Sequence, residues 1–249
     1  MLVENTGSQS GRPGRYLIVG ASGRLGAALA ARLAETGAEL ALVARTPAPL
    51  ERVRMALPAS AVAQHAVCDV VDAAAVRALA DRLHRDGEAF DGIVHAAGHL
   101  AGGPLFDMDQ RSVRAVLDTA VLGAHWIAQA FLPPMVARGR GRLVLVAAAA
   151  VAPSAGATAR GTSVPYVVAK SGLAVFGRAL SAELAGTGVS VSVVYPPTFE
   201  ESARPGVLSA AAVADSLLVL LTLGTPAISE LVLAPGLGEP QAGPASESL

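Results

Sequence analysis

The sequence predicts an α/β fold in which a parallel β-sheet lies between two layers of helices, within a single domain. Three observations lead to this fold class. Short apolar runs alternate with amphipathic segments, 52% of the 249 residues are hydrophobic while only 16% are charged, and no internal repeat or linker divides the chain. Such an alternation implies right-handed crossovers and a sheet that is covered on both faces.

The expected strands are short apolar runs bounded by polar or glycine-rich segments. They comprise residues 16–19, residues 40–43, a third strand that ends at 66–67, residues 92–96, residues 143–146 and residues 189–195.

The expected helices lie between these strands. Leucines at helical spacing after the first strand predict a helix that ends at Gly37. Asp72 can cap a later helix, because its carboxylate can accept from the free amides of the first turn. A long helix is expected over about 109–131, where Pro133 and Pro134 would stop it.

The two ends of the chain differ in composition from the rest. Residues 1–14 and 240–249 are rich in Gly, Pro, Ser and Gln, which predicts flexible tails. The folded domain is therefore expected to span residues 15–239.

Composition also argues against several classes of partner. The net charge is −1 and no basic stripe is present, so nucleic acid is not expected as a partner. The polar start lacks a signal peptide core, and the apolar run 143–152 is too short to cross a membrane as a helix. A single cysteine, Cys68, fits a reducing compartment. We therefore expect a cytoplasmic protein with no membrane partner.

A glycine-rich turn joins the first expected strand to the first helix. Glycine permits the tight turn and lets backbone amides approach a pyrophosphate at the helix N-terminus, where the dipole favours anions. The spacing Gly-x-x-Gly-x-x-Gly is a variant, but its place in the first strand–turn–helix unit favours a dinucleotide site in a Rossmann-type, doubly wound sheet over an ordinary turn. The residues expected to contact the cofactor here are Gly20, Ser22, Gly23, Arg24, Leu25 and Gly26.

The end of the second strand bears on the choice of cofactor. An acidic residue near this position would hold a ribose 2′-hydroxyl, whereas the arginine found there, Arg45, can pair with a 2′-phosphate. NADP(H) is therefore favoured over NAD(H), with a solvated surface arginine as the alternative.

From Tyr16 to Gly236 the chain resembles the short-chain dehydrogenase/reductase family. Five motifs carry the resemblance, in the family's order. They are the glycine turn, Cys68-Asp69-Val70, His95-Ala96-Ala97-Gly98, Tyr166-Val167-Val168-Ala169-Lys170, and Tyr195-Pro196-Pro197. They are similar to the family's cofactor loop, Asp-Val pair, Asn-Asn-Ala-Gly strand end, Tyr-x-x-x-Lys signature and Pro-Gly turn, and residues 228–236 resemble its closing strand.

The resemblance implies further cofactor contacts. In the family the aspartate of the Asp-Val pair contacts adenine, the Asn-Asn-Ala-Gly strand end lies beside the cofactor, and the later turn lies over the nicotinamide. The positions of this chain that match are Asp69, Val70, Ala96, Ala97, Gly98, Pro196, Pro197 and Phe199.

Tyr166 and Lys170 are the expected catalytic pair. Ser163 and Pro165 match a helix cap and first-turn proline, which would place Tyr166 and Lys170 one turn apart on one helix face. An ammonium beside a phenol should lower the phenol's pKa. The resemblance implies that Lys170 also holds the nicotinamide ribose and that Tyr166 protonates a carbonyl oxygen as hydride arrives.

Two other catalytic positions of the family are occupied by alanine. Counted from Gly141, Ala148 stands in the place of the substrate-orienting serine, and aligning on Gly123 puts Ala120 in place of the helix asparagine. Ser154 lies 12 residues before Tyr166, close to the family's usual gap, so it could serve instead. Other candidates are Thr158, Thr162 and Ser163, and His99, Glu200 and Glu201 could also reach the site.

The sequence leaves three functions open. The first is an NADP(H)-dependent reductase or dehydrogenase for a small organic substrate, in which a missing oxyanion donor costs on the order of 10²–10³ in rate. The second is a non-redox enzyme for dehydration, isomerisation or cyclisation, and the third is a non-catalytic cofactor-binding pseudoenzyme.

The remaining expectations concern metals and subunits. His95 and His99 are four residues apart, but a strand end and loop separate them, so no metal site is expected. The apolar helix at 109–131 and the helix after Tyr166 correspond to those with which the family pairs its subunits, so a homodimer or homotetramer is expected.

Overall fold

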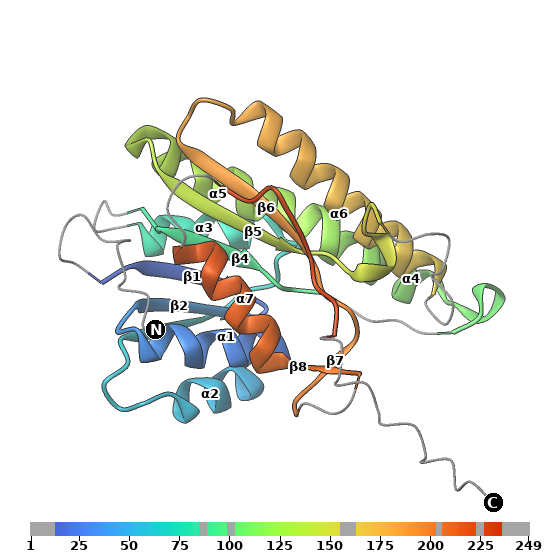
Figure 1. Cartoon of the computed structure of the whole chain (residues 1–249), viewed down its shortest axis with the longest axis horizontal. Coiled ribbons are helices and arrows are strands. Elements are labelled where there is room, and N and C mark those ends of the chain that lie inside the picture. Colours follow the sequence, from blue (N-terminus) through green and yellow to red (C-terminus); the bar gives the residue numbers. More distant parts are fainter. Residues whose placement is uncertain are drawn as a thin grey trace, which may run out of the picture.

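The fold is a seven-stranded parallel sheet between two layers of helices, as predicted (Figure 1). The computed structural model describes residues 13–84, 89–98, 103–154, 163–202, 206–222 and 227–235. The strand order is β3-β2-β1-β4-β5-β6-β9. The strands are β1 (Arg15–Val19), β2 (Glu39–Ala44), β3 (Ala63–Val67), β4 (Gly92–His95), β5 (Gly141–Val146), β6 (Val189–Tyr195) and β9 (Glu230–Val232).

Helices cover both faces of the sheet. They are α1 (Arg24–Glu35), α2 (Pro47–Ala56), α3 (Ala73–Leu83), α4 (Gln110–Leu117), α5 (Gly123–Arg138), α6 (Val164–Glu183) and α7 (Ala210–Thr222). A π-turn, η2 (Asp118–Leu122), joins α4 to α5. Shorter elements are η1 (Leu105–Asp107), η3 (Ala149–Val151) and the pair β7 (Phe199–Glu200) and β8 (Leu208–Ser209).

Two apolar cores lie on opposite faces of the sheet. In one, residues of α1, α2 and α7 pack on the strands, with Leu29, Leu50 and Leu217 fully buried. In the other, α3, α5 and α6 supply the cover, with Val76 and Phe131 fully buried. This double cover explains why the central strands read as continuous apolar runs rather than alternating ones.

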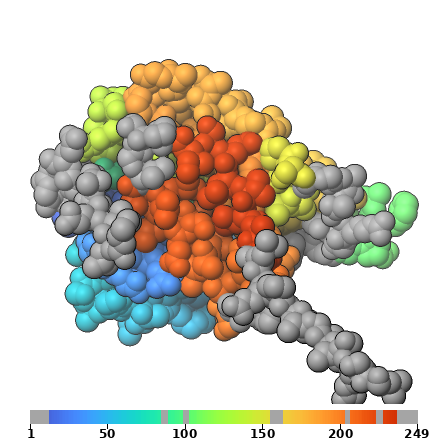
Figure 2. All heavy atoms as spheres, viewed as in Figure 1, coloured from blue at the N-terminus to red at the C-terminus, as the bar shows by residue number. Residues whose placement is uncertain are grey.

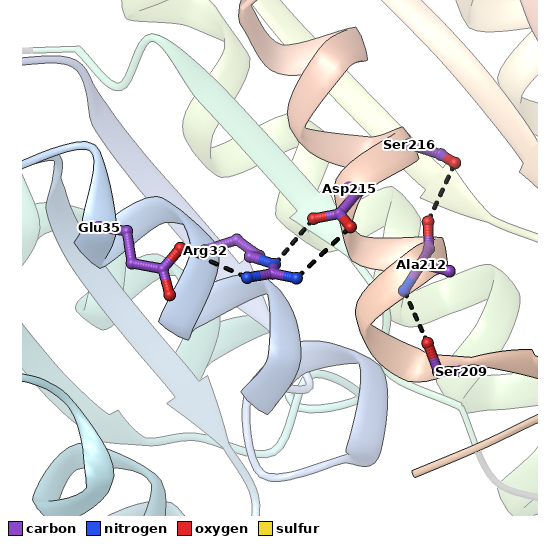
Figure 3. Close-up of polar contacts among 6 residues, drawn as sticks. All are labelled: Arg32, Glu35, Ser209, Ala212, Asp215 and Ser216. Carbon is purple, nitrogen blue, oxygen red and sulfur yellow. Dashed lines mark hydrogen bonds and ion pairs between the residues drawn. The ribbon is translucent and has the colours of Figure 1, made fainter. Parts of the chain in front are cut away.

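The contact between α1 and α7 brings distant parts of the chain together. Arg32 of α1 lies between Glu35, at 3.4 Å, and Asp215 of α7, at 2.7 Å (Figure 3). At the start of α7 the Ser209 hydroxyl accepts from the Ala212 amide at 3.1 Å. The surface of α7 and the closing segment occupies the centre of the face seen in Figure 2, between α1 and α6.

Several predicted boundaries are confirmed. The Asp72 carboxylate caps α3 by accepting from the amides of Ala74 and Ala75, and α1 ends before Gly37, whose φ is +76°. Asp109 caps α4 by accepting from the Ser112 amide. Of the predicted tails only Pro13 and Gly14 lie within the described residues, so those tails stay predictions.

The prediction that Pro133 and Pro134 stop the long helix is wrong. The α5 helix runs through both prolines to Arg138 and ends at Gly139, whose φ is +73°. A proline inside a helix costs about 3 kcal/mol. Leu132 and Met135 flank the prolines and are buried, and we attribute the continuation to this packing, since tertiary context can override local propensity.

The helical stretch from Gln110 to Arg138 bears on the membrane expectation. By length and composition this stretch of 29 residues could cross a membrane, although 44% of its apolar window is buried inside the protein. The argument against a membrane span from the sequence rests on residues 143–152 and does not cover this longer stretch. The absence of a membrane partner therefore stays a prediction. Ile127, Phe131 and Met135 pack in the core, which also suits a core helix.

The strand order places one crevice at a defined point of the sheet. From β1 the chain moves outward to β2 and β3, then returns to the other side of β1 with β4, β5 and β6. In doubly wound sheets ligands bind outside the carboxyl ends of the strands where the order reverses. Here that point lies at the ends of β1 and β4.

Candidate active site

The glycine turn after β1 is held tightly between its two neighbouring strands. The amides of Gly20 and Ala21 donate to the Val43 carbonyl of β2 at 2.8 and 3.0 Å. Gly20 has a φ of +90°, and a Cβ there would lie 2.6 Å from the Ala97 nitrogen after β4. Only glycine combines that backbone conformation with so close an approach.

The start of α1 presents its amides at this turn. Gly23 is the N-cap and makes no side-chain cap hydrogen bond, so the first amides of the helix lack a side-chain cap. A Cβ on Gly26 would collide with the Gly20 carbonyl, so this glycine lets the helix pack against the turn. A helix N-terminus approached by bare backbone suits a phosphate group.

Two further predicted residues of the turn, Arg24 and Leu25, play different parts. The Arg24 guanidinium donates to the Phe199 carbonyl at 3.4 Å and so links the turn to the segment after β6. Leu25 is buried in the core with α1, so only its backbone could face a cofactor. Phe199 itself is half-buried and packs on the same core.

A cavity of about 200 Å³ opens at the switch point of the sheet. The ends of β1, β2 and β4 and the segment after β3 form its walls. Nine of the predicted cofactor residues line it, namely Gly20, Ser22, Gly23, Arg45, Asp69, Val70, Ala96, Ala97 and Gly98. Sequence reasoning missed two polar lining residues, Thr46 and Thr119. Thr46 follows Arg45 directly, and this adjacency was the available signal.

Charged groups of the cavity occupy its β2 and β3 side. Arg45 is exposed, and within the described residues its guanidinium makes no hydrogen bond or ion pair, so it is available to an anionic ligand. The Asp69 carboxylate accepts from the Val71 amide at 3.2 Å, which orients it in the turn after β3.

Lys170 connects this cavity to the predicted catalytic pair. Its Nζ donates to the Val146 carbonyl at the end of β5, at 2.7 Å, and the side chain is only 5% exposed. A Cβ added to Gly98, a residue of the cavity wall, would lie 3.4 Å from the same Nζ. Tyr166 lies on the same helix, with its ring centroid 5.8 Å from Nζ. The ammonium therefore lies near both the Gly98 wall of the cavity and the Tyr166 ring.

The prediction that Lys170 lowers the pKa of Tyr166 is wrong for this structure. The pKa of the Tyr166 phenol is raised, because the half-buried ring loses solvation. Burial also lowers the pKa of Lys170 to about 8. The cause lies in the placement of the ammonium, which bonds a carbonyl of β5 rather than the phenol, so desolvation decides the pKa of Tyr166.

The two positions predicted for the family's serine and asparagine are buried alanines. Ala148 follows β5 and is 8% exposed, and Ala120 lies in the π-turn and is 2% exposed. Ser154 is exposed and, among the described residues, makes no hydrogen bond to Tyr166. Ser163 is the buried N-cap of α6, three residues before Tyr166.

The other predicted residues occupy the rim of this region or fall outside the description. The Pro196 carbonyl accepts from the Ala149 amide at 2.8 Å, which holds the turn after β6 beside the end of β5. Pro197 and Glu200 are half-buried and Glu201 is exposed. His99, Thr158 and Thr162 lie outside the described residues.

No metal centre emerges from the described part of the chain. Within it, no group of three or more His, Cys, Asp or Glu side chains could hold an ion.

Fold and site together define a class of protein. The strand order, the glycine turn and the cavity at the switch point are those of Rossmann-type α/β proteins, which bind ligands in this crevice. A family model described as short chain dehydrogenase matches residues 15–208. The chain therefore belongs to the short-chain dehydrogenase family, as its motifs predicted.

Three relatives carry the names of oxidoreductases, among them a dehydrogenase and a reductase. The chain is 33% identical over 181 residues to an "Uncharacterized oxidoreductase" of Myxococcus xanthus, an alignment that covers 72% of this chain and 70% of that protein. It is 32% identical over 189 residues to "Galactitol 2-dehydrogenase (L-tagatose-forming)" of Cereibacter sphaeroides, with 72% and 68% covered. A "Fatty acyl-CoA reductase" of Acinetobacter baylyi is 29% identical over 185 residues, and the alignment spans 73% of this chain but only 61% of that relative.

Solved structures share the fold. A metagenomic short-chain oxidoreductase in complex with NADP superposes with a TM-score of 0.77 at 28% identity, covering 90% of this chain and 98% of that one. An alcohol dehydrogenase from Thermococcus sibiricus reaches a TM-score of 0.80 at 22% identity, covering 92% and 100%, which shows the fold alone.

Proposed function

We propose that this protein is an NADP(H)-dependent oxidoreductase that reduces a carbonyl of a small organic substrate, or oxidises the corresponding alcohol. The observation that carries the proposal is the Tyr166–Lys170 pair at the Gly98 end of the cavity. Tyr166 would act as the general acid or base. The named relatives, which are dehydrogenases and reductases, support the same chemistry.

The cavity fits the cofactor by shape and by charge. The first amides of α1, which lack a side-chain cap, would hold the pyrophosphate. Arg45 would pair with the 2′-phosphate, and Asp69 with Val70 would hold the adenine. When bound, the nicotinamide supplies or accepts the hydride. Its ring would lie toward Ala96, Ala97 and Gly98, under the turn formed by Pro196, Pro197 and Phe199.

Tyr166 and Lys170 would divide the handling of the proton. Because the pKa of Tyr166 is raised, the phenol stays protonated near neutral pH and can donate its proton to a carbonyl oxygen as the carbon gains hydride. Lys170, whose pKa is about 8, would keep much of its positive charge at neutral pH and attract the oxygen on which negative charge develops. It would also contact the nicotinamide ribose.

Nothing equivalent to the family's serine hydroxyl stands at Ala148. Among the described residues, Ser154 and Ser163 are the candidates for that role. A hydroxyl donor from either would orient the substrate oxygen. Without one, we expect a slower reductase rather than an inactive protein, because an acid and a charged neighbour remain.

NADPH consumption tests the activity. Purified protein is incubated with NADPH and a panel of aldehydes, ketones and β-ketoacyl thioesters, and nicotinamide absorbance is followed. We expect consumption that depends on both the protein and a carbonyl substrate. NADPH binding without consumption across the panel would contradict the redox proposal and favour the non-catalytic alternative.

Replacement of Arg45 tests the cofactor preference. Arg45→Ala should weaken NADPH binding by roughly tenfold and leave NADH affinity nearly unchanged, since one charge-assisted contact to phosphate is lost. Arg77→Ala removes an exposed arginine on α3, outside the lining of this cavity, and is the matched control. Equal affinities of the wild-type protein for NADH and NADPH would argue against the preference.

A non-redox reaction is the second candidate, and the two buried alanines favour it. With Ala148 and Ala120 in place of two side chains of the usual set, Tyr166 and Lys170 are the members of that set that remain to move protons. Such an enzyme would dehydrate, isomerise or cyclise its substrate. Product formation without any change in nicotinamide absorbance would distinguish it from the reductase.

An apolar surface supports the expected homodimer or homotetramer. Leu122, Val164, Val168 and Val175 are 42–54% exposed, and all lie on α6 or on the π-turn that contacts it. Light scattering coupled to size-exclusion chromatography should give at least twice the chain mass of 25.0 kDa. The cytoplasmic location stays a prediction that fractionation would test.

A further inference from the structure

His95 is the most deeply buried polar side chain near the cavity that the proposed chemistry does not use. It is the last residue of β4, it is 0% exposed, and it lies in register with Val19 of β1 and Leu145 of β5. Its Nε2 lies 3.3 Å from the carbonyl oxygen of Thr119 in the π-turn. A ring so enclosed, with one nitrogen on a backbone carbonyl, links the central sheet to the helix that covers it.

The chemistry of that contact determines which nitrogen carries the proton. A carbonyl oxygen only accepts, so Nε2 must donate and carries the hydrogen. Burial and the nearby Lys170 ammonium lower the pKa of His95 to about 4, so the ring is neutral at physiological pH and Nδ1 is unprotonated. A neutral imidazole in this tautomer is a hydrogen-bond donor toward Thr119 and not a proton carrier for catalysis.

The π-turn packs directly on this ring. A Cβ added to Gly123, the first residue after the turn, would lie 3.5 Å from His95 Cε1 and 2.7 Å from Cγ2 of Val70. Both Thr119, held by His95, and Val70 line the cavity. A π-turn is an irregular segment that helix propensity does not specify, so its position depends on such tertiary contacts.

We propose that His95 is a positioning residue for the cofactor site, whose Nε2–H holds the π-turn so that Thr119 forms one wall of the cavity. This inference rests on the proposed function, because one of its two tests measures NADPH binding. His95 touches neither the expected substrate nor the expected cofactor atoms, and it acts through Thr119. The imidazole therefore contributes its shape and one donor, at a position where the family usually has an asparagine.

Three variants separate positioning from simple loss of packing. His95→Phe keeps a ring but removes the donor, whereas His95→Asn keeps an N–H group. His84→Phe is the matched control, because His84 follows α3, packs its ring near Phe90 and Phe131, and does not line this cavity. NADPH dissociation constants are measured by fluorescence titration, and hydrogen exchange is measured at the amides of residues 118–123.

In His95→Phe the NADPH dissociation constant should rise by roughly five- to tenfold, the size expected for losing one hydrogen bond that orders a site. The amides of residues 118–123 should exchange faster. His95→Asn should recover most of the affinity, and His84→Phe should match the wild type in both measurements.

The two measurements distinguish failure of this inference from failure of the proposed function. Unchanged affinity and exchange in His95→Phe would overturn the role of His95 while leaving NADPH binding intact. If the wild type binds no NADPH, the proposed function fails, and exchange alone decides whether His95 holds the turn. Should His95→Phe not fold, nitrogen shifts of the wild-type imidazole decide, since an Nδ1-protonated neutral ring would overturn the inference.

Discussion

The two halves of the candidate site are built from different materials. At the β1–β2 side the cavity is made of backbone amides and glycines, with Gly20, Gly23 and Gly26 at the closest approaches. At the β5–α6 side the chemistry depends on side chains, and the buried Ala148 and Ala120 occupy the positions that the sequence predicts for the family's serine and asparagine. The backbone half therefore depends on glycines, while the side-chain half is predicted to lack two polar side chains.

This difference has a physical reason. The shape of the glycine turn depends on the backbone and on the absence of Cβ atoms at its glycines. Substitutions at other positions therefore leave this shape unchanged as long as the glycines are kept. A catalytic hydroxyl can be lost by one substitution without disturbing the packing, because serine and alanine differ by a single atom. We therefore expect binding of the cofactor to be robust and the rate of reaction to be the variable property.

The largest effect should come from the remaining acid of the side-chain half. Tyr166→Phe should lower kcat by about 10²–10⁴, the usual contribution of a positioned general acid, with NADPH affinity unchanged. Stopped-flow or steady-state NADPH consumption measures it. Tyr16→Phe, at a buried tyrosine of β1 outside the cavity lining, is the control and should keep normal turnover. Retained turnover in Tyr166→Phe would refute its assignment.

A hydroxyl added at position 148 should increase the catalytic efficiency. Ala148→Ser should raise kcat/KM by up to about 10²-fold, since one donor to a developing oxyanion is commonly worth that much. Ala152→Ser, at another buried alanine after β5, should change little. If neither variant is faster, then the donor comes from elsewhere, such as Ser154 or Ser163, or the reaction is not a hydride transfer.

Acid should lower the free energy of unfolding through protonation of His95, which lies between the central sheet and the π-turn. Its folded-state pKa is about 4 and its unfolded value about 6.5, so the unfolded state binds more protons in this window. Stability is full above pH 6.5 and falls as the pH drops toward 4, by about 3 kcal/mol for this group. Urea unfolding at several pH values measures it. In His95→Phe the same pH window should show a shallower slope.

In the backbone half of the site, a single Cβ added at Gly20 should lower both the stability of the protein and its NADPH affinity. Gly20→Ala introduces both a strained positive φ and a contact of 2.6 Å to Ala97, so it should cost about 2 kcal/mol and weaken NADPH binding. Gly37→Ala shares the positive φ but has nothing within 4 Å, so it should cost about 1 kcal/mol and leave binding unchanged. Equal NADPH affinity in both variants would contradict the proposed cradle.

The smallest effect is expected far from both halves, at the α1–α7 contact. Asp215→Asn removes one of the two charged partners of Arg32, and the Arg32 and Asp215 side chains are both more than a third exposed. An exposed ion pair contributes at most about 1 kcal/mol, so the loss in unfolding free energy should be smaller than that. Thermal unfolding measures it, and a larger loss would show that the pair organises the contact shown in Figure 3.

Local patterns predicted some elements well and others poorly. The sequence predicts the Asp72 cap because a short carboxylate before an apolar helical pattern has a specific partner in the first turn. The α2 helix was not predicted, since only Leu50 of its ten residues is buried and the amphipathic pattern is weak. The π-turn at 118–122 was not predicted either, because no residue type specifies it.

The fold class, the glycine turn, the Tyr166–Lys170 spacing and the two alanines could be predicted from the sequence, because they depend on period, residue type and order along the chain. The other features could be found only in the folded protein. It showed the helix passing through Pro133 and Pro134, the Lys170 ammonium bonded to the Val146 carbonyl, and His95 holding the π-turn. Each of these outcomes depends on burial and on partners distant in sequence, and those forces outweigh local propensity and ideal pKa values.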